Sequence, residues 1–259
     1  MKTNFLKEKE CSQAIDAWNS MRLKYEHIIE LIDPRSGFKF EKGDCQELLK
    51  DSSDYFHAYF GVHHAKVILI AKPLDENGKE RKLSKYVYVP YAPMENNLAI
   101  IEIDTVTTTK TTILTPDLKI SKLTKEIDLP TSNEPLFPEE ICVQDIELWK
   151  DNCLDWFFRE CSEYGGKGIF RFFRVPTVDL AIKGTDYTAV QALFGLKFSM
   201  IYQKSYPALI FVSTKDPKTA LSEPLVGSEI FTPAVMNSKD YSQPCPPFCK
   251  DMVLERNTW

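Results

Sequence analysis

The amino-acid sequence predicts an α+β protein made of two tandem related units, each a long helix packed on a small antiparallel sheet. Two observations predict this class. A motif spelled C-x-Q-x-I-[DE]-x-W occurs twice, beginning at Cys11 and at Cys142, and each copy lies in an amphipathic helical segment. Segments that alternate apolar and polar residues, separated by turn residues, follow both helices and are typical of antiparallel strands. An internal duplication therefore organises the prediction.

The first unit is predicted to begin with an amphipathic helix from about residue 5 to residue 32. Its apolar residues recur every three or four positions and therefore share one face. Asp33-Pro34 is expected to end the helix, because the residue before a proline is pushed out of the helical region. The residues of the stripe are Ile15, Trp18, Met21, Tyr25, Ile28, Ile29 and Ile32.

A strand, a short helix and a meander are predicted to follow. Asp44 is expected to cap the short helix, with Glu47 completing a capping box. The Asn77-Gly78 pair is typical of a tight hairpin turn. The predicted strands are 38–40, 55–62, 66–71, 86–89 and 98–103, and the last continues into a threonine-rich run at 105–112.

The second unit repeats this order after a proline-rich linker at 115–139. Its helix carries an apolar stripe that includes Trp149 and is expected to stop at Gly165-Gly166. Segments 38–40, 57–62 and 67–71 match 170–172, 191–196 and 208–212, and the offset grows from 131 residues at the motif (142 − 11) to 141 at the last match (208 − 67). The predicted units are residues 1–128, with the extra threonine-rich strand, and residues 136–259, with a Cys/Pro-rich tail.

The composition is that of a soluble globular protein, with 259 residues, 43% hydrophobic and 27% charged. A formal net charge of −5 argues against a general nucleic-acid or anionic-membrane binder. The charged first residues and the lack of an apolar run of about 18 residues predict neither a signal peptide nor a membrane span, so we expect a cytoplasmic protein. Seven cysteines, an odd number, favour free thiols, with one bridge or a metal clip at the last pair left open.

The tail carries the sequence P-C-P-P-F-C at 244–249. Together with the preceding plan, this tail resembles a group of small uncharacterised bacterial proteins that consist of one helix-plus-β-meander unit and a C-terminal Pro-Cys-Pro-x-x-Cys tail. Here the unit occurs in two tandem copies, and the tail follows only the second. The resemblance implies a bacterial protein of this architecture and transfers no catalytic residue.

Cys245 and Cys249 are the candidate metal ligands. A zinc site usually needs four ligands, and His63 and His64, at a predicted hairpin tip, are the residues that could complete it. A small disulfide loop and ordinary packing of the two cysteines are the alternatives.

A second candidate is the outer face of the strand 55–62. Its inner face is apolar, whereas the outer face carries Tyr55, His57 and Tyr59. With Tyr86 and Tyr88 these residues form a predicted exposed aromatic surface for a ligand or partner, and Gln191 is the polar counterpart of His57 in the second unit. The alternatives are a strand face open to solvent and tyrosines that merely cover the second long helix.

The function is predicted to be that of a non-enzymatic binding or scaffolding protein, with a protein or small-molecule ligand as partner. We predict no cofactor, no nucleic acid and no membrane, and the sequence does not predict the oligomeric state. The alternative is an enzyme with a site between the halves that uses His57 as acid or base. A third hypothesis is a metal- or redox-responsive cysteine tail. The duplicated motif itself is predicted to mark the helix core, because its Ile and Trp residues lie on the apolar stripe.

Overall fold

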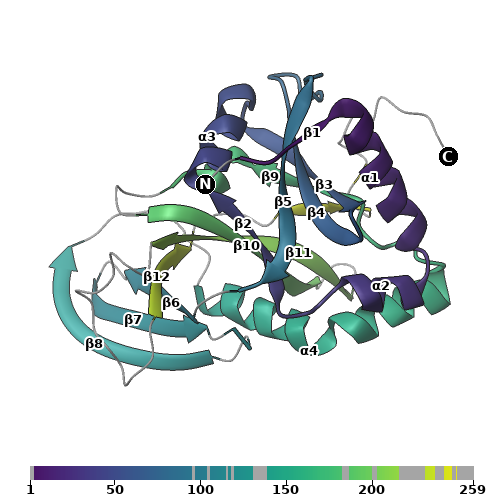
Figure 1. The fold of residues 1–259 in the computed structure, drawn as a ribbon. Helices are drawn as coiled ribbons and strands as arrows, with labels where there is room; N and C mark the ends of the chain where they lie inside the picture. Colours follow the sequence, from purple (N-terminus) through teal and green to yellow (C-terminus); the bar gives the residue numbers. More distant parts are fainter. Residues whose placement is uncertain are drawn as a thin grey trace.

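The computed structural model describes residues 3–94, 97–103, 106–114, 116–117, 120–130, 139–182, 187–199, 203–215, 231–236, 242–246 and 249. Helices and largely antiparallel strands occur together, as the α+β class requires (Figure 1). The helices are α1 (Glu8–Met21), α2 (Tyr25–Leu31), α3 (Lys42–Asp51) and α4 (Glu139–Tyr164), with a 3-10 turn η1 (Thr177–Leu180). The strands are β1 (Phe5–Lys7), β2 (Ser36–Glu41), β3 (Tyr55–His63), β4 (Lys66–Pro73), β5 (Lys85–Pro93), β6 (Asn97–Ile103), β7 (Val106–Leu114), β8 (Ile120–Pro130), β9 (Phe172–Pro176), β10 (Tyr187–Ser199), β11 (Lys204–Lys215), β12 (Phe231–Met236) and β13 (Gln243–Cys245).

The strands form one sheet in the order β13-β9-β3-β4-β5-β2-β10-β11-β12-β6-β7-β8, with β1 added beside β5. Ser242, just before β13, bonds across to β11: its hydroxyl accepts from the Leu209 amide at 2.6 Å and donates to the Leu209 carbonyl at 3.1 Å. This contact brings the first strand of the order beside the eighth, so β13 to β11 form a nearly closed barrel. Strands β6, β7 and β8 extend away from it at the lower left of Figure 1.

The two predicted units exchange strands. β2, from the first unit, pairs with β10 in the second, and β9, from the second unit, pairs with β3 in the first. The prediction of one small sheet for each unit is therefore wrong, because both units contribute strands to one continuous sheet. A barrel can close in this way because each exchanged strand buries its apolar face against the other unit.

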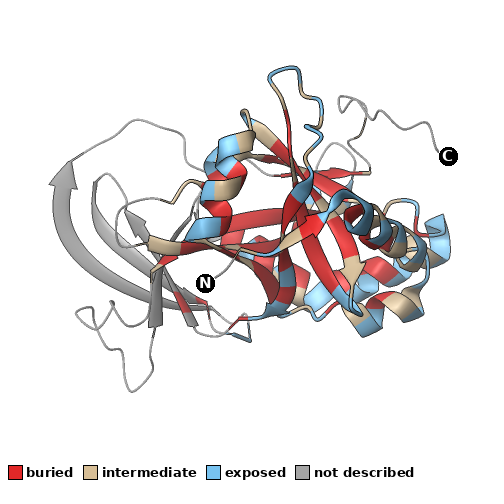
Figure 2. Ribbon diagram, turned by 45° about the horizontal axis from the view of Figure 1, so that its top comes forward, coloured by how far each residue is buried: buried red, intermediate tan, exposed pale blue. Residues whose placement is uncertain are grey.

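Four phenylalanines fill the centre of the barrel. The rings of Phe60 and Phe194 lie 5.6 Å apart. Phe38 lies 5.7 Å from Phe60 and 6.1 Å from Phe194, and Phe173 lies 5.8 Å and 6.3 Å from the same two rings. Exposure of all four is at most 1%. Figure 2 shows this burial concentrated on the central strands.

The long helices cover matching places on the barrel, and the tryptophan of each helix packs on the phenylalanines of its core. The Trp18 ring of α1 lies 5.6 Å from Phe60, and the Trp149 ring of α4 lies 4.4 Å from Phe194. Cys11 and Cys142, which begin the two motifs, are also buried. The duplicated motif is therefore part of the core, as the sequence predicts.

The pairing corrects two of the sequence matches. Phe38 lies opposite Ala192, and Phe173 lies opposite Ala58. Because the predicted duplication matches Ala58 to Ala192 at the offset of 134 (192 − 58), it would have to match 38–40 to 173–175 and not to 170–172. Gly61 pairs with Ile68 and Gly195 with Ala208, so the second hairpin strand is also displaced by one residue from the predicted match.

The first predicted helix is wrong in its extent. Residues 5–7 form β1, and the chain turns between α1 and α2. Arg22 stabilises this turn, because its guanidinium donates to the carbonyls of Gly166 at 2.9 Å and Ile169 at 2.7 Å. The cap of α3 also differs, since Glu41 is the N-cap and Asp44 the third helical residue. The predicted linker at 115–139 contains β8, which pairs with β7.

No helix within the described ranges is long and apolar enough to cross a membrane.

Two glycines allow the helices to approach the sheet. A Cβ atom at Gly61 would lie 3.0 Å from both Ala14 Cβ and Ile70 Cδ1, and one at Gly195 would lie 2.6 Å from Ile210 Cδ1 and 3.2 Å from Asp145 Cβ. Each glycine is therefore a contact point of a helix on a strand.

We predict that Gly61→Ala and Gly195→Ala each lower the free energy of unfolding by about 1–3 kcal/mol, because each added methyl group overpacks its helix–strand contact. Urea denaturation measures the effect. Gly43→Ala in α3 is the control, since its Cβ would meet only Thr3 Oγ1, at 3.2 Å, and alanine favours a helix. Unchanged stability in both test variants would contradict the described helix contacts.

The exchange of strands predicts the behaviour of a divided chain. Residues 1–130 keep β5 but lack β10, the other partner of β2, and residues 139–259 keep β13 but lack β3, the other partner of β9. We expect neither fragment to unfold cooperatively alone, and the mixture to regain a cooperative transition by circular dichroism. A fragment that melts alone at the temperature of the intact chain would contradict the exchanged architecture.

Candidate functional site

Part of the outer face of the sheet carries polar and aromatic side chains. A row of directly paired residues crosses five strands there: Cys245 on β13, Phe172 on β9, Tyr59 on β3, Ile70 on β4 and Tyr88 on β5. Residues two apart on a strand share a face, so His57 stands beside Tyr59. α1 covers one end of this face through Cys11 and Ala14.

Glu80, in the segment between β4 and β5, gathers three of these side chains. We call this group, His57, Tyr59, Lys72 and Glu80, the Glu80 network. Glu80 Oε1 lies 2.8 Å from His57 Nδ1 and accepts a hydrogen bond of 2.6 Å from the Tyr59 hydroxyl. Lys72 Nζ lies 3.5 Å from Oε2 and 4.7 Å from the centre of the Tyr59 ring. The carboxylate is thus satisfied on both oxygens.

The charge of Glu80 is fixed by these partners. Partial burial by itself raises the pKa of the Glu80 carboxyl, but the hydrogen bond from His57, the Lys72 charge and the Tyr59 hydrogen bond outweigh it and lower the pKa to about 2. Because an ionised carboxylate only accepts hydrogen bonds, His57 Nδ1 is the donor in this contact. His57 is nevertheless only 1% exposed, and its ring lies 4.6 Å from Phe172.

The structure brings together only some of the predicted surface residues. His57 and Tyr59 share the Glu80 network, and Lys72 also lies over the Tyr86 ring, at 5.5 Å. Tyr55 instead stacks under the Arg174 guanidinium at 3.6 Å. Gln191 lies in β10, paired with Lys39 and Val212, away from the network.

The predicted exposed aromatic surface is wrong. Tyr86 is 4% exposed, and Tyr55, Tyr59 and Tyr88 are half-buried. The physical reason is the first helix and not the second: Cys11 and Ala14 of α1, with Leu6 of β1, form a cluster with Tyr86. Their packing covers the face that strand alternation alone leaves open.

The two candidate metal ligands form a disulfide, Cys245–Cys249. In this state neither sulfur is a thiolate ligand. Within the described residues no group of three or more His, Cys, Asp and Glu side chains is placed to hold a metal ion. His63 and His64 lie at the end of the β3–β4 hairpin, where the His63 ring is 6.0 Å from Tyr88.

Sequence analysis missed an apolar surface on the two neighbouring helices α2 and α4. We call Tyr25, Ile29, Leu154 and Phe158 the α2–α4 patch. Phe158 is 54% exposed and Ile29 is 46% exposed, and the Tyr25 ring meets Phe158 edge-on at 5.3 Å. Ile29 lies one turn from Tyr25, and Leu154 one turn from Phe158, so the four side chains are neighbours.

One signal could have found this patch. The predicted stripe of the second helix includes Trp149, Cys153 and Phe157, whereas Leu154 and Phe158 lie off it, so this helix has a second apolar side. The predicted single helix also placed Ile28 and Ile29 on one stripe. The turn at Arg22 reorients α2, so that Ile28 is fully buried and Ile29 faces outward.

No protein-family model matches this chain, and comparison with curated proteins and with solved structures finds no match either. Any functional argument therefore rests on the residues of this chain.

The Glu80 network predicts a pH-dependent contribution to stability. Glu80 has a folded-state pKa of about 2 against an ordinary 4.5, so its stabilising effect is present above pH 4.5 and is lost as the pH falls toward 2. We expect Glu80→Gln to cost about 2 kcal/mol at pH 7 and much less at pH 3. Thermal unfolding at both pH values measures this difference.

The matched control is Glu47→Gln, which changes an exposed carboxylate on α3 paired with Lys50. Its effect on unfolding is expected to be small at both pH values. An equal loss from Glu80→Gln at pH 7 and pH 3 would contradict the assigned ionisation.

Proposed function

We propose that this chain is a non-enzymatic binding protein that holds a basic amphipathic helix of a partner protein on the α2–α4 patch. The observation that carries the proposal is Phe158, an aromatic side chain that is 54% exposed on α4 and meets the Tyr25 ring of α2. Large apolar side chains that remain exposed together on a folded surface are typical of interaction sites. Aromatic anchors of this kind contribute much of the binding energy in interfaces.

The charges around the patch favour a basic partner. Exposed carboxylates described on the same two helices are Glu26, Glu30, Asp151, Asp155 and Glu163, against the exposed cations Arg159 on α4 and Lys24 at the N-cap of α2. This excess of negative charge agrees with the net charge of −5. Two adjacent helices with an apolar strip between polar rims suit a helical segment whose apolar face enters the strip. Opposite charges then orient the segment and speed its association.

The arrangement of the halves supports a further part of the proposal, that the two units arose by duplication. Phe60 and Phe194 occupy matching positions, as do Trp18 and Trp149 against them. At the motif offset of 131 residues, α2 (25–31) corresponds to 156–162 within the continuous helix α4, so the first unit has a turn where the second has an unbroken helix. The α2–α4 patch therefore occurs once, at a place where the units differ.

The enzymatic alternative has one supporting observation. Glu80 contacts Nδ1 and so orients the His57 ring, and Nε2 is the ring nitrogen that an acid or base role would use. However, His57 is 1% exposed and packs on Phe172, so a substrate would have to displace that packing. We therefore favour a structural role for this histidine.

Binding of a defined peptide tests the proposal. The probe is a fluorescent synthetic helix with leucine on one face and lysine on the other, and anisotropy measures its Kd. We expect the wild-type protein to bind it and Phe158→Ala to raise the Kd at least tenfold, because the central aromatic contact is lost.

Leu148→Ala is the matched control, since Leu148 is 46% exposed on the same helix but outside the patch. Its Kd should equal that of the wild type. A second probe replaces every lysine with glutamate and should bind at least tenfold more weakly. Equal binding of both peptides, or equal loss in both variants, would show non-specific apolar adsorption and refute the proposal.

A further inference from the structure

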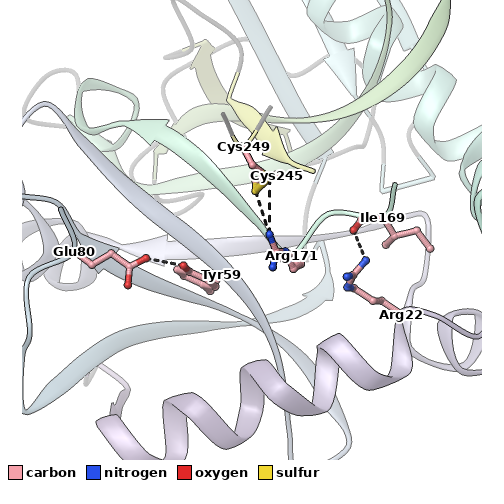
Figure 3. Close-up of a disulfide and its surroundings, with 7 residues drawn as sticks. All are labelled: Arg22, Tyr59, Glu80, Ile169, Arg171, Cys245 and Cys249. Atoms are coloured by element: carbon pink, nitrogen blue, oxygen red, sulfur yellow. Dashed lines mark hydrogen bonds between the residues drawn. A yellow bond between two sulfur atoms is a disulfide. The ribbon is translucent and has the colours of Figure 1, made fainter. Parts of the chain in front are cut away.

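We propose that Cys245 and Cys249 form a redox-active disulfide that exchanges with thiols, with Arg171 as the residue that stabilises the departing thiolate. This inference is independent of the α2–α4 patch. It starts from the surroundings of the two sulfurs, which Figure 3 shows together with Arg171.

The two cysteines differ in access. Cys245 is fully buried and packs with Phe172, whereas Cys249 is half-buried at the edge of the same cluster. A thiolate attacks a disulfide along a path that must be open at the attacked sulfur. The less buried member, Cys249, is therefore the sulfur that an incoming thiol reaches, and Cys245 is the leaving group.

The Arg171 side chain lies beside both sulfurs of the disulfide. Its Nη2 lies 3.7 Å from Cys245 Sγ and 3.9 Å from Cys249 Sγ. Its backbone is fixed on both sides, because its amide donates to the Cys245 carbonyl at 2.7 Å and its carbonyl accepts from the Phe60 amide at 3.0 Å. A guanidinium held beside a sulfur favours the thiolate and makes the disulfide easier to reduce.

The proposed thiol–disulfide exchange takes place in two steps. A substrate thiolate attacks Cys249 Sγ, a bond forms between the substrate sulfur and Cys249, and the Cys245–Cys249 bond breaks with its electron pair left on Cys245. A second substrate thiolate attacks the substrate sulfur of this mixed disulfide and releases Cys249 as a thiolate. Two substrate thiols are oxidised to one disulfide, the protein disulfide is reduced to two cysteines, and the protons of the substrate thiols pass to solvent or to the cysteines.

The other described cysteines are unsuited to this chemistry. Burial raises the pKa of the Cys11 thiol to about 11, and those of Cys45 and Cys153 to about 12. A buried thiol that stays protonated is a poor nucleophile. Under the cytoplasmic localisation that the sequence predicts, a disulfide would also be expected to be catalytic or regulatory, because structural disulfides are rare there.

The test uses the full-length oxidised protein in glutathione buffers of graded ratio and, separately, in graded dithiothreitol. After acid quenching and alkylation, mass spectrometry gives the reduced fraction of the Cys245–Cys249 pair. We expect Arg171→Met to require at least tenfold more reducing buffer for half-reduction, a shift of about 30 mV, and Arg171→Lys to stay near the wild type. Arg174→Met is the control and should match the wild type, because Arg174 lies in β9, which begins directly after Arg171, but stacks on Tyr55.

The identity of the attacked sulfur gives a second readout that does not depend on stability. When treated with glutathione disulfide, Cys245→Ser should form a mixed disulfide at Cys249 and release glutathione as the leaving thiolate, whereas Cys249→Ser should leave Cys245 largely unmodified. Reduction by glutathione would assign a monothiol partner, and reduction by dithiothreitol alone would assign a dithiol partner. Resistance to both, an unchanged midpoint in a folded Arg171→Met variant, or preferential modification of Cys245 would overturn the proposal.

Discussion

The contact between Phe60 and Phe194 is the interaction on which the rest of the structure depends. These rings lie 5.6 Å apart and belong to strands from the two halves. Each ring also meets the tryptophan of one long helix, so one aromatic cluster joins the helices to the barrel. Removal of either ring would leave a large cavity shared by both halves, which is the costliest kind of core change. The halves are therefore unlike two independent domains in physical terms, because they share one core.

Because side chains fill this shared core, both proposed sites lie outside it. The interior faces of β2, β3, β9 and β10 are filled by phenylalanine rings. The exchange of strands that buries those rings also sets the contacts on the outer face. Phe172 of β9 packs on the His57 ring, and Cys245 of β13 lies opposite Phe172. The surroundings of the disulfide thus come from three distant segments of the chain. Arg171 precedes β9 directly and contacts all three through backbone and side chain.

The sequence predicted the elements better than their pairing. Strand alternation located β3 and β4, and the repeated motif identified buried helix positions, because both signals are local. Register is not local. The segment Phe170 to Val175 offers more than one phenylalanine to match Phe38, and Phe170 and Phe173 are both fully buried, so burial alone could not choose between them. Glu80 gave no signal, because its role arises only when the segment after β4 folds back over His57 and Tyr59.

Arg22 links the two proposed sites. Its side chain holds the turn that precedes β9, its carbonyl oxygen lies 3.9 Å from the Cys161 sulfur of α4, and it stands two residues before the helix α2 boundary at Lys24. Burial, and then the charge of Arg171, lower the pKa of the Arg22 guanidinium to about 10. A route for coupling would therefore run from a change of charge at the disulfide to Arg171, and from Arg171 to Arg22 beside α2. If reduction changes the affinity of the α2–α4 patch by some factor, thermodynamic linkage requires that a bound partner change the reduction equilibrium by the same factor. Equal midpoints with and without the bound peptide would establish that the two sites act independently.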